Sequence, residues 1–256
     1  MLAFVTGATS GFGAAICRRF ARNGHRLIAA GRRAERLADL AAELGPAVAR
    51  TIPLDVRDAA AVQRAVAELP ADLAAVDLLV NNAGLARGLE PAQRASLDDW
   101  MEMVDTNIKG LITLTRAILP GMVARDRGHV INIGSTAASW PYLGANVYGA
   151  TKAFVHQFSL NLRADLQGTR VRVTVLHPGI AAGTEFSNVR FHGDDQRAAE
   201  VYQRTEPLQA EDVADTVHWV ATLPAHVNVN SLELMPVAQS FAGLSVSRQP
   251  GLPGAK

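Results

Sequence analysis

Seven short, mostly apolar runs recur along the 256-residue chain, and segments long enough to form helices separate them. The first six runs are almost continuously apolar rather than alternating, which is typical of strands buried on both faces of a sheet. Parallel neighbours of this kind need crossover connections, and these are usually helices. The pattern therefore predicts an α/β fold, a Rossmann-like doubly wound parallel sheet of about seven strands with helices on both faces. The predicted strands cover residues 2–7, 25–31, 49–56, 76–84, 128–135, 171–179 and 227–237.

Composition and connection lengths predict a single domain over residues 1–256. Hydrophobic residues make up 48% of the chain and charged residues 19%, which suits a globular fold with a substantial core. Residues 182–209 are polar, lack periodicity and are long for a connection, so they are predicted to form a substrate lid. Residues 240–256, which include Pro250 and Pro253, are predicted to extend beyond the core.

Charge and residue usage argue against several function classes. The net charge is +1 with no long run of one sign, so neither nucleic acid nor a membrane surface is an expected partner. The start of the chain lacks a signal-peptide pattern, and no run reaches the roughly 18 apolar residues of a spanning helix, so we expect a cytoplasmic protein. The only cysteine, Cys17, is expected to be a small buried apolar residue. The seven histidines lack metal-ligand spacing, so no metal site is predicted.

A glycine-rich stretch, TGATSGFG, follows the first predicted strand and leads into a helix-like segment. In a doubly wound sheet, ligands bind beyond the carboxyl ends of the strands. Glycines at this turn let the backbone approach a pyrophosphate, whose charge the N-terminus of the helix favours. The spacing differs from the GxGxxG dinucleotide pattern, but its position at the first strand-to-helix turn still predicts a dinucleotide site. The predicted cofactor contacts here are Gly7, Ala8, Thr9, Ser10, Gly11, Phe12 and Gly13.

The end of the second predicted strand indicates which dinucleotide binds. An acidic residue at this place selects NAD by holding the ribose 2′-hydroxyl, whereas arginine accommodates the 2′-phosphate of NADP. Gly31 stands where the acid would be, and Arg32 and Arg33 follow it. The alternative is two solvated arginines that open a helix, but a helix N-terminus is an unfavourable place for cations without an anion. We therefore expect NADP rather than NAD.

The stretch NVYGATKAF places Tyr148 and Lys152 four residues apart, so that on a helix they share one face. Taken alone, this spacing is more often a solvated surface than a catalytic site. For catalysis, lowering the pKa of a tyrosine from about 10 to about 7 takes roughly 4 kcal/mol. An ammonium about 4 Å away supplies about that much at an effective dielectric constant of about 20. If the site is catalytic, the lysine is therefore well placed to lower the pKa of an acid/base tyrosine; the spacing alone does not decide between the two interpretations.

Several motifs occur in a fixed order along the chain: TGATSGFG, LDV at 54–56, NNAG at 81–84, DTNIKG, INIGSTA, YGATK and HPG. Together they resemble the short-chain dehydrogenase/reductase family over nearly the whole chain. The resemblance implies that Ser135 hydrogen-bonds the reacting oxygen and that Tyr148 exchanges its proton. It also implies that Lys152 holds the nicotinamide ribose and that Asn107 anchors a water-borne proton relay to Lys152. Further cofactor contacts that it implies are Asp55, Val56, Asn82, Ala83, Gly84, Pro178, Gly179, Ile180 and Thr184.

Longer stretches, among them GRRAERL, GTEFSNVRF and TLPAHVNVNSLELMPV, resemble the NADP-dependent 3-hydroxy acid dehydrogenases. That group interconverts small 3-hydroxy acids, such as serine, allo-threonine, 3-hydroxyisobutyrate and 3-hydroxypropionate, with 3-oxo acids or semialdehydes. The alternatives are a general ketone or 3-oxoacyl carrier reductase, and a non-catalytic NADP-binding regulator. Family members are commonly homotetramers. Phe154, Phe158 and Leu162 are interface candidates, although their spacing suits the core equally well.

A hydroxy-acid substrate needs a partner for its carboxylate, because an unpaired buried charge is costly. Arg190, in the predicted lid, is a candidate, and backbone amides of the lid are its main competitor. For Arg87, which follows NNAG, we expect an ordinary exposed arginine. For His177, which precedes a Pro-Gly pair at a strand end, we expect a structural, hydrogen-bonded role.

Overall fold

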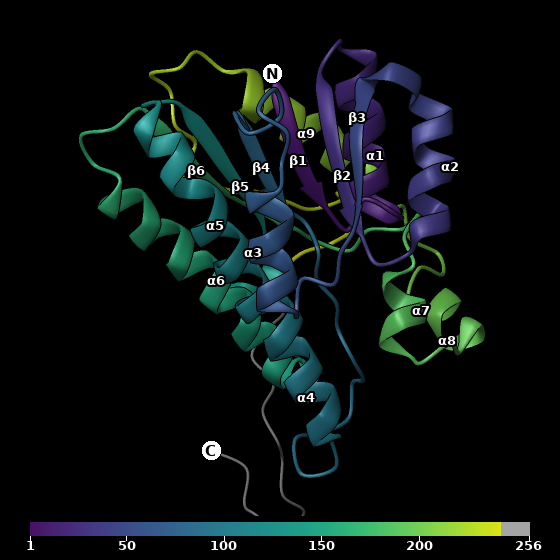
Figure 1. Ribbon diagram of the computed structural model, residues 1–256. Coiled ribbons are helices and arrows are strands. Elements are labelled where there is room, and N and C mark those ends of the chain that lie inside the picture. The colour runs from purple at the N-terminus through teal and green to yellow at the C-terminus, as the bar shows by residue number, and fades with distance from the viewer. Residues whose placement is uncertain (242–256) are drawn as a thin grey trace, which may run out of the picture.

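The computed structural model describes residues 1–241, and residues 242–256 lie outside the described part. Seven strands form one sheet in the order β3-β2-β1-β4-β5-β6-β7, and each neighbouring pair is parallel (Figure 1). The strand order reverses between β1 and β4, at the kind of switch point where such sheets bind ligands. The strands are β1 (Leu2–Thr6), β2 (Arg26–Gly31), β3 (Val48–Pro53), β4 (Leu78–Asn81), β5 (Gly128–Ile133), β6 (Val171–Pro178) and β7 (Ser231–Leu234).

Helices cover both faces of the sheet, and each face has its own apolar core (Figure 1). One layer contains α1 (Gly11–Arg22), α2 (Ala34–Leu44) and α9 (Ala210–Thr222). The opposite layer contains α3 (Ala59–Ala67), α5 (Leu111–Ala124) and α6 (Asn146–Asp165). Smaller elements are α4 (Leu97–Val104), the π-helical η2 (Asp105–Gly110), α7 (Phe186–Arg190), α8 (Asp195–Glu200) and the 3-10 turns η1 (Gly45–Ala47) and η3 (Thr136–Ala138).

The apolar runs of the sequence form the centre of this sandwich. Every residue of β1, β4 and β5 is buried, as expected for strands covered by helices on both sides. Each predicted run overlaps one observed strand, so the predicted fold class is confirmed. Cys17 is fully buried in the core beside α9, and burial raises the pKa of its thiol to about 12. It therefore behaves as the small apolar residue that was predicted.

The remaining sequence predictions concern segments at the edge of the core. The predicted lid at residues 182–209 contains the two short helices α7 and α8. The predicted extension at residues 240–256 falls almost entirely outside the described residues. Of the interface candidates, Leu162 and Phe158 pack in the core, whereas Phe154 keeps 37% of its surface exposed. In the described part of the chain, no helix has the length and apolar character needed to cross a membrane.

Candidate active site

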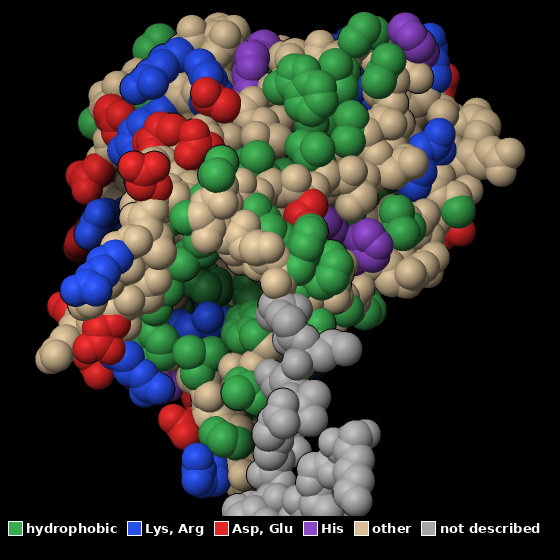
Figure 2. Space-filling view, turned by 180° about the vertical axis from the view of Figure 1, so that it is seen from behind, with side chains coloured by type: hydrophobic (Ala, Val, Ile, Leu, Met, Phe, Trp, Pro, Cys, Tyr) green, Lys and Arg blue, Asp and Glu red, His purple; other side chains and the backbone are tan. Residues whose placement is uncertain are grey.

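A cavity of about 490 Å³ runs along the carboxyl ends of the strands. In the view from behind, the lower half of the molecule is hollowed and lined largely by hydrophobic side chains (Figure 2). The cavity wall includes residues that directly follow β1, β2, β4, β5 and β6, so segments far apart in the sequence meet there. All the predicted cofactor residues line it except Ala8 and Gly13.

The glycine loop presents backbone rather than side chains to the cavity. Gly7 has a φ of +63°, a conformation that favours glycine. A Cβ on Gly13 would lie 2.2 Å from the carbonyl oxygen of Gly7, so only glycine allows α1 to start this close to the loop. Ser10 precedes α1 without a side-chain cap among the described residues, which leaves the first N–H groups of the helix for a ligand. This arrangement fits a pyrophosphate.

At the end of β2, the structure explains why glycine replaces the acidic residue. A Cβ on Gly31 would lie 2.8 Å from Cγ2 of Thr9, so a carboxylate side chain does not fit there without a shift. Arg32 lines the cavity beside it. The guanidinium of Arg33 pairs with Glu185 at 2.8 Å and donates to the carbonyl oxygen of Thr9 at 3.3 Å. Two arginines in place of the acid suit a phosphorylated ribose.

Asp55 lies at the next strand end, where the adenine contact was predicted. Its carboxylate is held by the guanidinium of Arg57, with an N–O distance of 2.6 Å. The hydrogen bond from Arg57 is the main cause that lowers the pKa of Asp55. Asp55 therefore enters the cavity as a fixed, ionised group, and it is not available as a proton donor near neutral pH.

The acid/base candidates gather at the opposite end of the cavity. Tyr148 and Lys152 lie on α6, each with only 7% of its surface exposed. Ser135 follows β5 and caps η3, with its Oγ accepting from the N–H of Ala137 at 3.1 Å. The Ser135 side chain also acts on Tyr148, because it lowers the pKa of the tyrosine hydroxyl. The predicted triad of Ser135, Tyr148 and Lys152 is therefore brought together by one strand end and one helix.

The pKa values of this group differ from the sequence-based prediction. Burial raises the pKa of Tyr148 to about 12, and the polar side chain of Ser135 and the charge of Arg190 offset part of that rise. Lys152 instead donates from Nζ to the carbonyl oxygen of Ile133 at 2.9 Å, and its Nζ lies 5.9 Å from the centre of the Tyr148 ring. The prediction that Lys152 lowers the pKa of Tyr148 is therefore wrong for the protein chain alone. Burial also lowers the pKa of Lys152 to about 8.

Asn107 lies in the π-helical segment η2, behind the cavity wall rather than in it. Its Nδ2 donates to the carbonyl oxygen of Leu85 at 2.9 Å and to Oγ1 of Thr151 at 3.0 Å, while its Oδ1 accepts from the N–H of Leu85 at 2.9 Å. The side chain thus joins the loop after β4 to the helix that carries Lys152. A π-helical turn inside a helix often marks a functional position.

His177 has the predicted structural role. It is 3% exposed, its Nδ1 lies 3.0 Å from the carbonyl oxygen of Ser135, and its Nε2 lies 2.9 Å from Nδ1 of His156. Burial lowers the pKa of His177 to about 4, so the ring is neutral near pH 7. His177 therefore supports the backbone of Ser135 from outside the cavity.

The two candidate arginines for a substrate carboxylate lie in different environments. Arg190 lines the cavity, and its guanidinium lies 5.2 Å from the ring centres of both Tyr148 and Phe186. Its Nη2 donates to the hydroxyl of Tyr142 at 2.6 Å, while its Nε is buried with no hydrogen-bond partner in residues 1–241. Arg87 is not an ordinary exposed arginine, since it is partly buried and ion-paired to Glu102 outside the cavity lining.

Sequence reasoning missed the apolar and aromatic wall around Arg190. Tyr142, Phe186, Val189 and Tyr202 line the cavity, and none of them was predicted. Tyr142 precedes the Tyr-Lys motif, and Phe186 and Val189 lie inside the quoted lid stretch, so their position was the available signal. Their type alone gave no indication, because aromatic side chains are as common in cores as in sites. No cluster of three metal-ligating side chains is found within residues 1–241.

A family model described as short chain dehydrogenase matches residues 1–195, which is most of the chain. The chain belongs to this family. The glycine loop, the Tyr-Lys helix and Ser135 all fall within the matched region.

Known short-chain dehydrogenases match nearly the full length. An NADP-dependent 3-hydroxy acid dehydrogenase YdfG from Salmonella typhi is 64% identical over 97% of this chain and 100% of its own. A serine 3-dehydrogenase from Agrobacterium fabrum is 52% identical over 96% of this chain and 97% of its own. Among solved structures, the closed form of a serine dehydrogenase complexed with NADP+ matches with a TM-score of 0.95 and 62% identity, over 97% of this chain and 100% of that one.

Proposed function

We propose that the protein is an NADP-dependent oxidoreductase that interconverts small 3-hydroxy acids with their 3-oxo acids or semialdehydes. The substrates proposed are of the serine, allo-threonine, 3-hydroxyisobutyrate and 3-hydroxypropionate type. The observation that carries the proposal is a single cavity with Tyr148, Ser135 and Arg190 at one end and Arg32 and Arg33 at the other. The relatives named above, which share more than half of their residues with this chain, support it.

The residues at the cofactor end fit NADP. The N–H groups at the start of α1 would hold the pyrophosphate, and Arg32 and Arg33 would hold the 2′-phosphate. Asp55, Val56 and residues 82–84 would contact the adenine side and the middle of the cofactor. When bound, NADPH supplies a hydride to the carbonyl carbon of the substrate, and NADP+ accepts the hydride in the reverse direction.

The residues at the substrate end position the substrate and supply the proton. Ser135 would donate its hydroxyl hydrogen to the reacting carbonyl oxygen. Tyr148 is protonated near neutral pH because its pKa is raised, so it can give a proton to that oxygen as the hydride reaches the carbon. In the oxidative direction the deprotonated, phenolate form of Tyr148 would take the hydroxyl proton. Lys152 would hold the nicotinamide ribose. Asn107 would fix the position of the Tyr-Lys helix relative to the loop after β4, through its bonds to Thr151 and Leu85.

Arg190 would bind the substrate carboxylate. Its Nε is buried without a partner in residues 1–241, and a carboxylate oxygen would satisfy it with a charge-assisted hydrogen bond. Tyr142, Phe186 and Tyr202 surround the position and would exclude water, which strengthens the ion pair. The backbone amides of the lid, which were the competing partner, carry no charge of their own and would bind the carboxylate more weakly.

Replacement of Arg190 by Met is expected to lower kcat/KM for 3-hydroxyisobutyrate by about 1.5 to 3 kcal/mol, because a charge-assisted hydrogen bond is lost. The methyl ester of the same acid keeps the hydroxyl-bearing carbon chain and replaces the charge by a neutral ester group, so its kcat/KM is expected to stay nearly unchanged. Initial rates with both substrates measure the difference. Equal losses for acid and ester would show that Arg190 supports the lid and does not recognise the carboxylate.

Replacement of Arg32 by Ala is expected to weaken NADPH binding by about 1.5 to 3 kcal/mol and to leave NADH binding unchanged, because only NADPH carries the 2′-phosphate. Fluorescence titration with each cofactor measures this. Arg36 lies on α2 outside the cavity lining and serves as the matched control, with no expected effect of Arg36→Ala. An equal loss for both cofactors would assign Arg32 a structural role.

A substrate panel separates this proposal from its alternatives. We expect NADP-dependent rates with serine, allo-threonine, 3-hydroxyisobutyrate and 3-hydroxypropionate that exceed those with simple secondary alcohols. Preference for a 3-oxoacyl thioester would favour a carrier reductase instead. NADPH binding without turnover of any substrate would favour a regulator. A cytoplasmic location and a homotetramer remain predictions. For the homotetramer, the exposed Phe154 is a candidate interface residue.

A further inference from the structure

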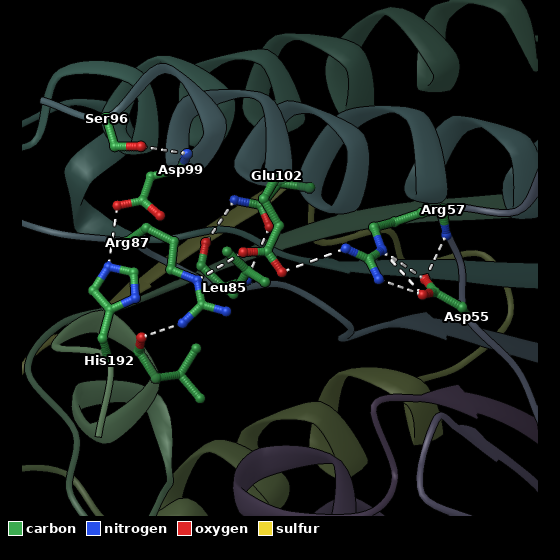
Figure 3. A network of polar contacts seen from close by, with 10 residues as sticks. Asp55, Arg57, Leu85, Arg87, Ser96, Asp99, Glu102 and His192 are labelled. Atoms are coloured by element: carbon green, nitrogen blue, oxygen red, sulfur yellow. Dashed lines mark hydrogen bonds and ion pairs between the residues drawn. The ribbon is translucent and has the colours of Figure 1, made fainter.

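A guanidinium group bridges three elements next to the cavity (Figure 3). Nε of Arg87, in the loop after β4, donates to Oε2 of Glu102 on α4 at 2.8 Å. Nη1 of the same residue donates to the carbonyl oxygen of Val189 on the lid helix α7 at 2.6 Å. We call this arrangement of Arg87, Glu102 and the Val189 carbonyl the Arg87 clasp. It ties the lid to the body of the protein.

The second carboxylate oxygen of Glu102 also has a cationic partner, Arg57, which helps to fix the side chain of Glu102 in the clasp. Nη1 of Arg57 lies 3.4 Å from Oε1 of Glu102, and the same guanidinium forms an ion pair with Asp55 (Figure 3). The hydrogen bond from Arg87 is the main cause that lowers the pKa of Glu102, so the carboxylate stays ionised near neutral pH. The side chains of Arg87 and Glu102 are only 20% and 22% exposed, so solvent screens this pair less than a surface pair.

The lid helix depends on such outside contacts. Helix α7 has five residues, and a helix this short is not stable by itself. N–H groups just after the helix bond the carbonyl groups of Ser187, Asn188 and Val189, whereas the carbonyl of Arg190 has no such local partner in residues 1–241. Arg87 binds the carbonyl of Val189, and the N–H of Gly88 donates to the carbonyl of Arg190 at 2.8 Å. Two consecutive residues of the β4 loop therefore hold the carbonyl groups on both sides of the Arg190 Cα.

We infer that Arg87 is a positioning residue for substrate recognition, because it fixes the backbone from which Arg190 reaches the substrate carboxylate. Arg87 lies outside the cavity lining, so it acts through the lid and does not touch the substrate. The clasp holds Arg190 where its guanidinium lies against Tyr148 and Phe186, with the Nε unpaired within the described residues. This inference rests on the proposed role of Arg190.

Replacement of Arg87 by Met is expected to raise KM for 3-hydroxyisobutyrate about tenfold while kcat and the Kd for NADPH change less than about twofold. The rise in KM comes from a weaker contact between Arg190 and the substrate carboxylate, so KM for the uncharged methyl ester should stay unchanged. In the Arg190→Met background, Arg87→Met should have no further effect on the acid, because the residue through which it acts is already gone. A merely structural role would produce neither the split between acid and ester nor this loss of additivity.

Two further variants complete the test, one as a control for general damage and one as a second disruption of the clasp. Arg125 donates from Nη2 to the carbonyl oxygen of Val76 at 2.8 Å, near the amino ends of the strands, so Arg125→Met removes a similar bond without touching the lid. Its kinetics should match those of the unmodified protein. Glu102→Gln removes the charge that anchors Arg87 and should raise KM for the acid in the same direction. This second variant keeps the test decisive if Arg87→Met does not fold.

The outcomes separate this inference from the proposed function. If Arg190→Met discriminates acid from ester but Arg87→Met and Glu102→Gln do not, the inference is overturned and the carboxylate role of Arg190 stands. Additive effects of Arg87→Met and Arg190→Met on the acid also overturn it. If Arg190→Met alone fails to discriminate acid from ester, the carboxylate role fails, and the inference falls with it.

Discussion

Tyr148→Phe is expected to lower kcat by about a thousandfold while NADPH binding stays nearly unchanged, because the change removes the transferable proton and little of the cofactor site. The ring stays in place, so its packing against Phe186, with a ring-centre distance of 5.7 Å, is kept. Steady-state rates with 3-hydroxyisobutyrate and a fluorescence titration with NADPH measure the two effects separately.

Tyr142→Phe is the matched control, since Tyr142 lines the same cavity and bonds Arg190 rather than Ser135. It removes a hydroxyl from the substrate end without removing the proposed proton donor. We expect its kcat to stay within about fivefold of the original value, since one hydrogen bond contributes about 1 kcal/mol or less there. A Tyr148→Phe variant whose kcat falls no more than that of Tyr142→Phe would rule out the proposed proton transfer.

The sheet could be predicted from the sequence because its central strands are buried on both faces. Such strands need mostly apolar residues, as in residues 2–5, Leu-Ala-Phe-Val, every one of which is buried. The position of the cofactor end of the cavity could also be predicted from the sequence. Gly13 and Gly31 are required there because close contacts leave no room for a Cβ. In both places the identity of the residue is set by contacts within or beside a short, regular element.

The internal structure of the predicted lid, residues 182–209, could not be predicted in the same way. Helix α7 is defined by contacts with distant residues, among them the pair of Arg33 with Glu185 and the Arg87 clasp. Neither contact has a local sequence pattern, and Arg87 was expected to be an ordinary exposed arginine for that reason. The orientation of the Lys152 ammonium could not be predicted either. It is set by a hydrogen bond to the carbonyl oxygen of Ile133 on β5, and the residue spacing on α6 gives no information about that contact.

Lys152→Met is expected to abolish turnover and, in the absence of cofactor, to stabilise the fold at pH 7. Burial lowers the pKa of Lys152 from 10.5 to about 8, so holding a buried ammonium at neutral pH destabilises the folded state. That difference corresponds to about 3 kcal/mol, and loss of the bond to the Ile133 carbonyl offsets about 1 kcal/mol of it. We therefore expect a net increase of about 2 kcal/mol in the free energy of unfolding.

The pH dependence distinguishes this cause from better packing. Between pH 8 and 10.5 the unfolded chain holds the Lys152 proton more tightly than the folded chain, so the stability of the original protein rises with pH in that window. The variant lacks this rise, and its advantage should therefore be full below about pH 8 and disappear above about pH 10.5.

Urea unfolding at several pH values measures this dependence, with Lys109→Met as control, because Lys109 is 60% exposed and pairs with Asp105 on the surface. Two results would show that the buried ammonium does not destabilise the folded state. One is a Lys152→Met variant with a lower free energy of unfolding at pH 7, and the other is a variant whose gain in that free energy is the same at every pH. The expected combination, a more stable protein without turnover, would mean that the buried charge is kept for its role at the active site.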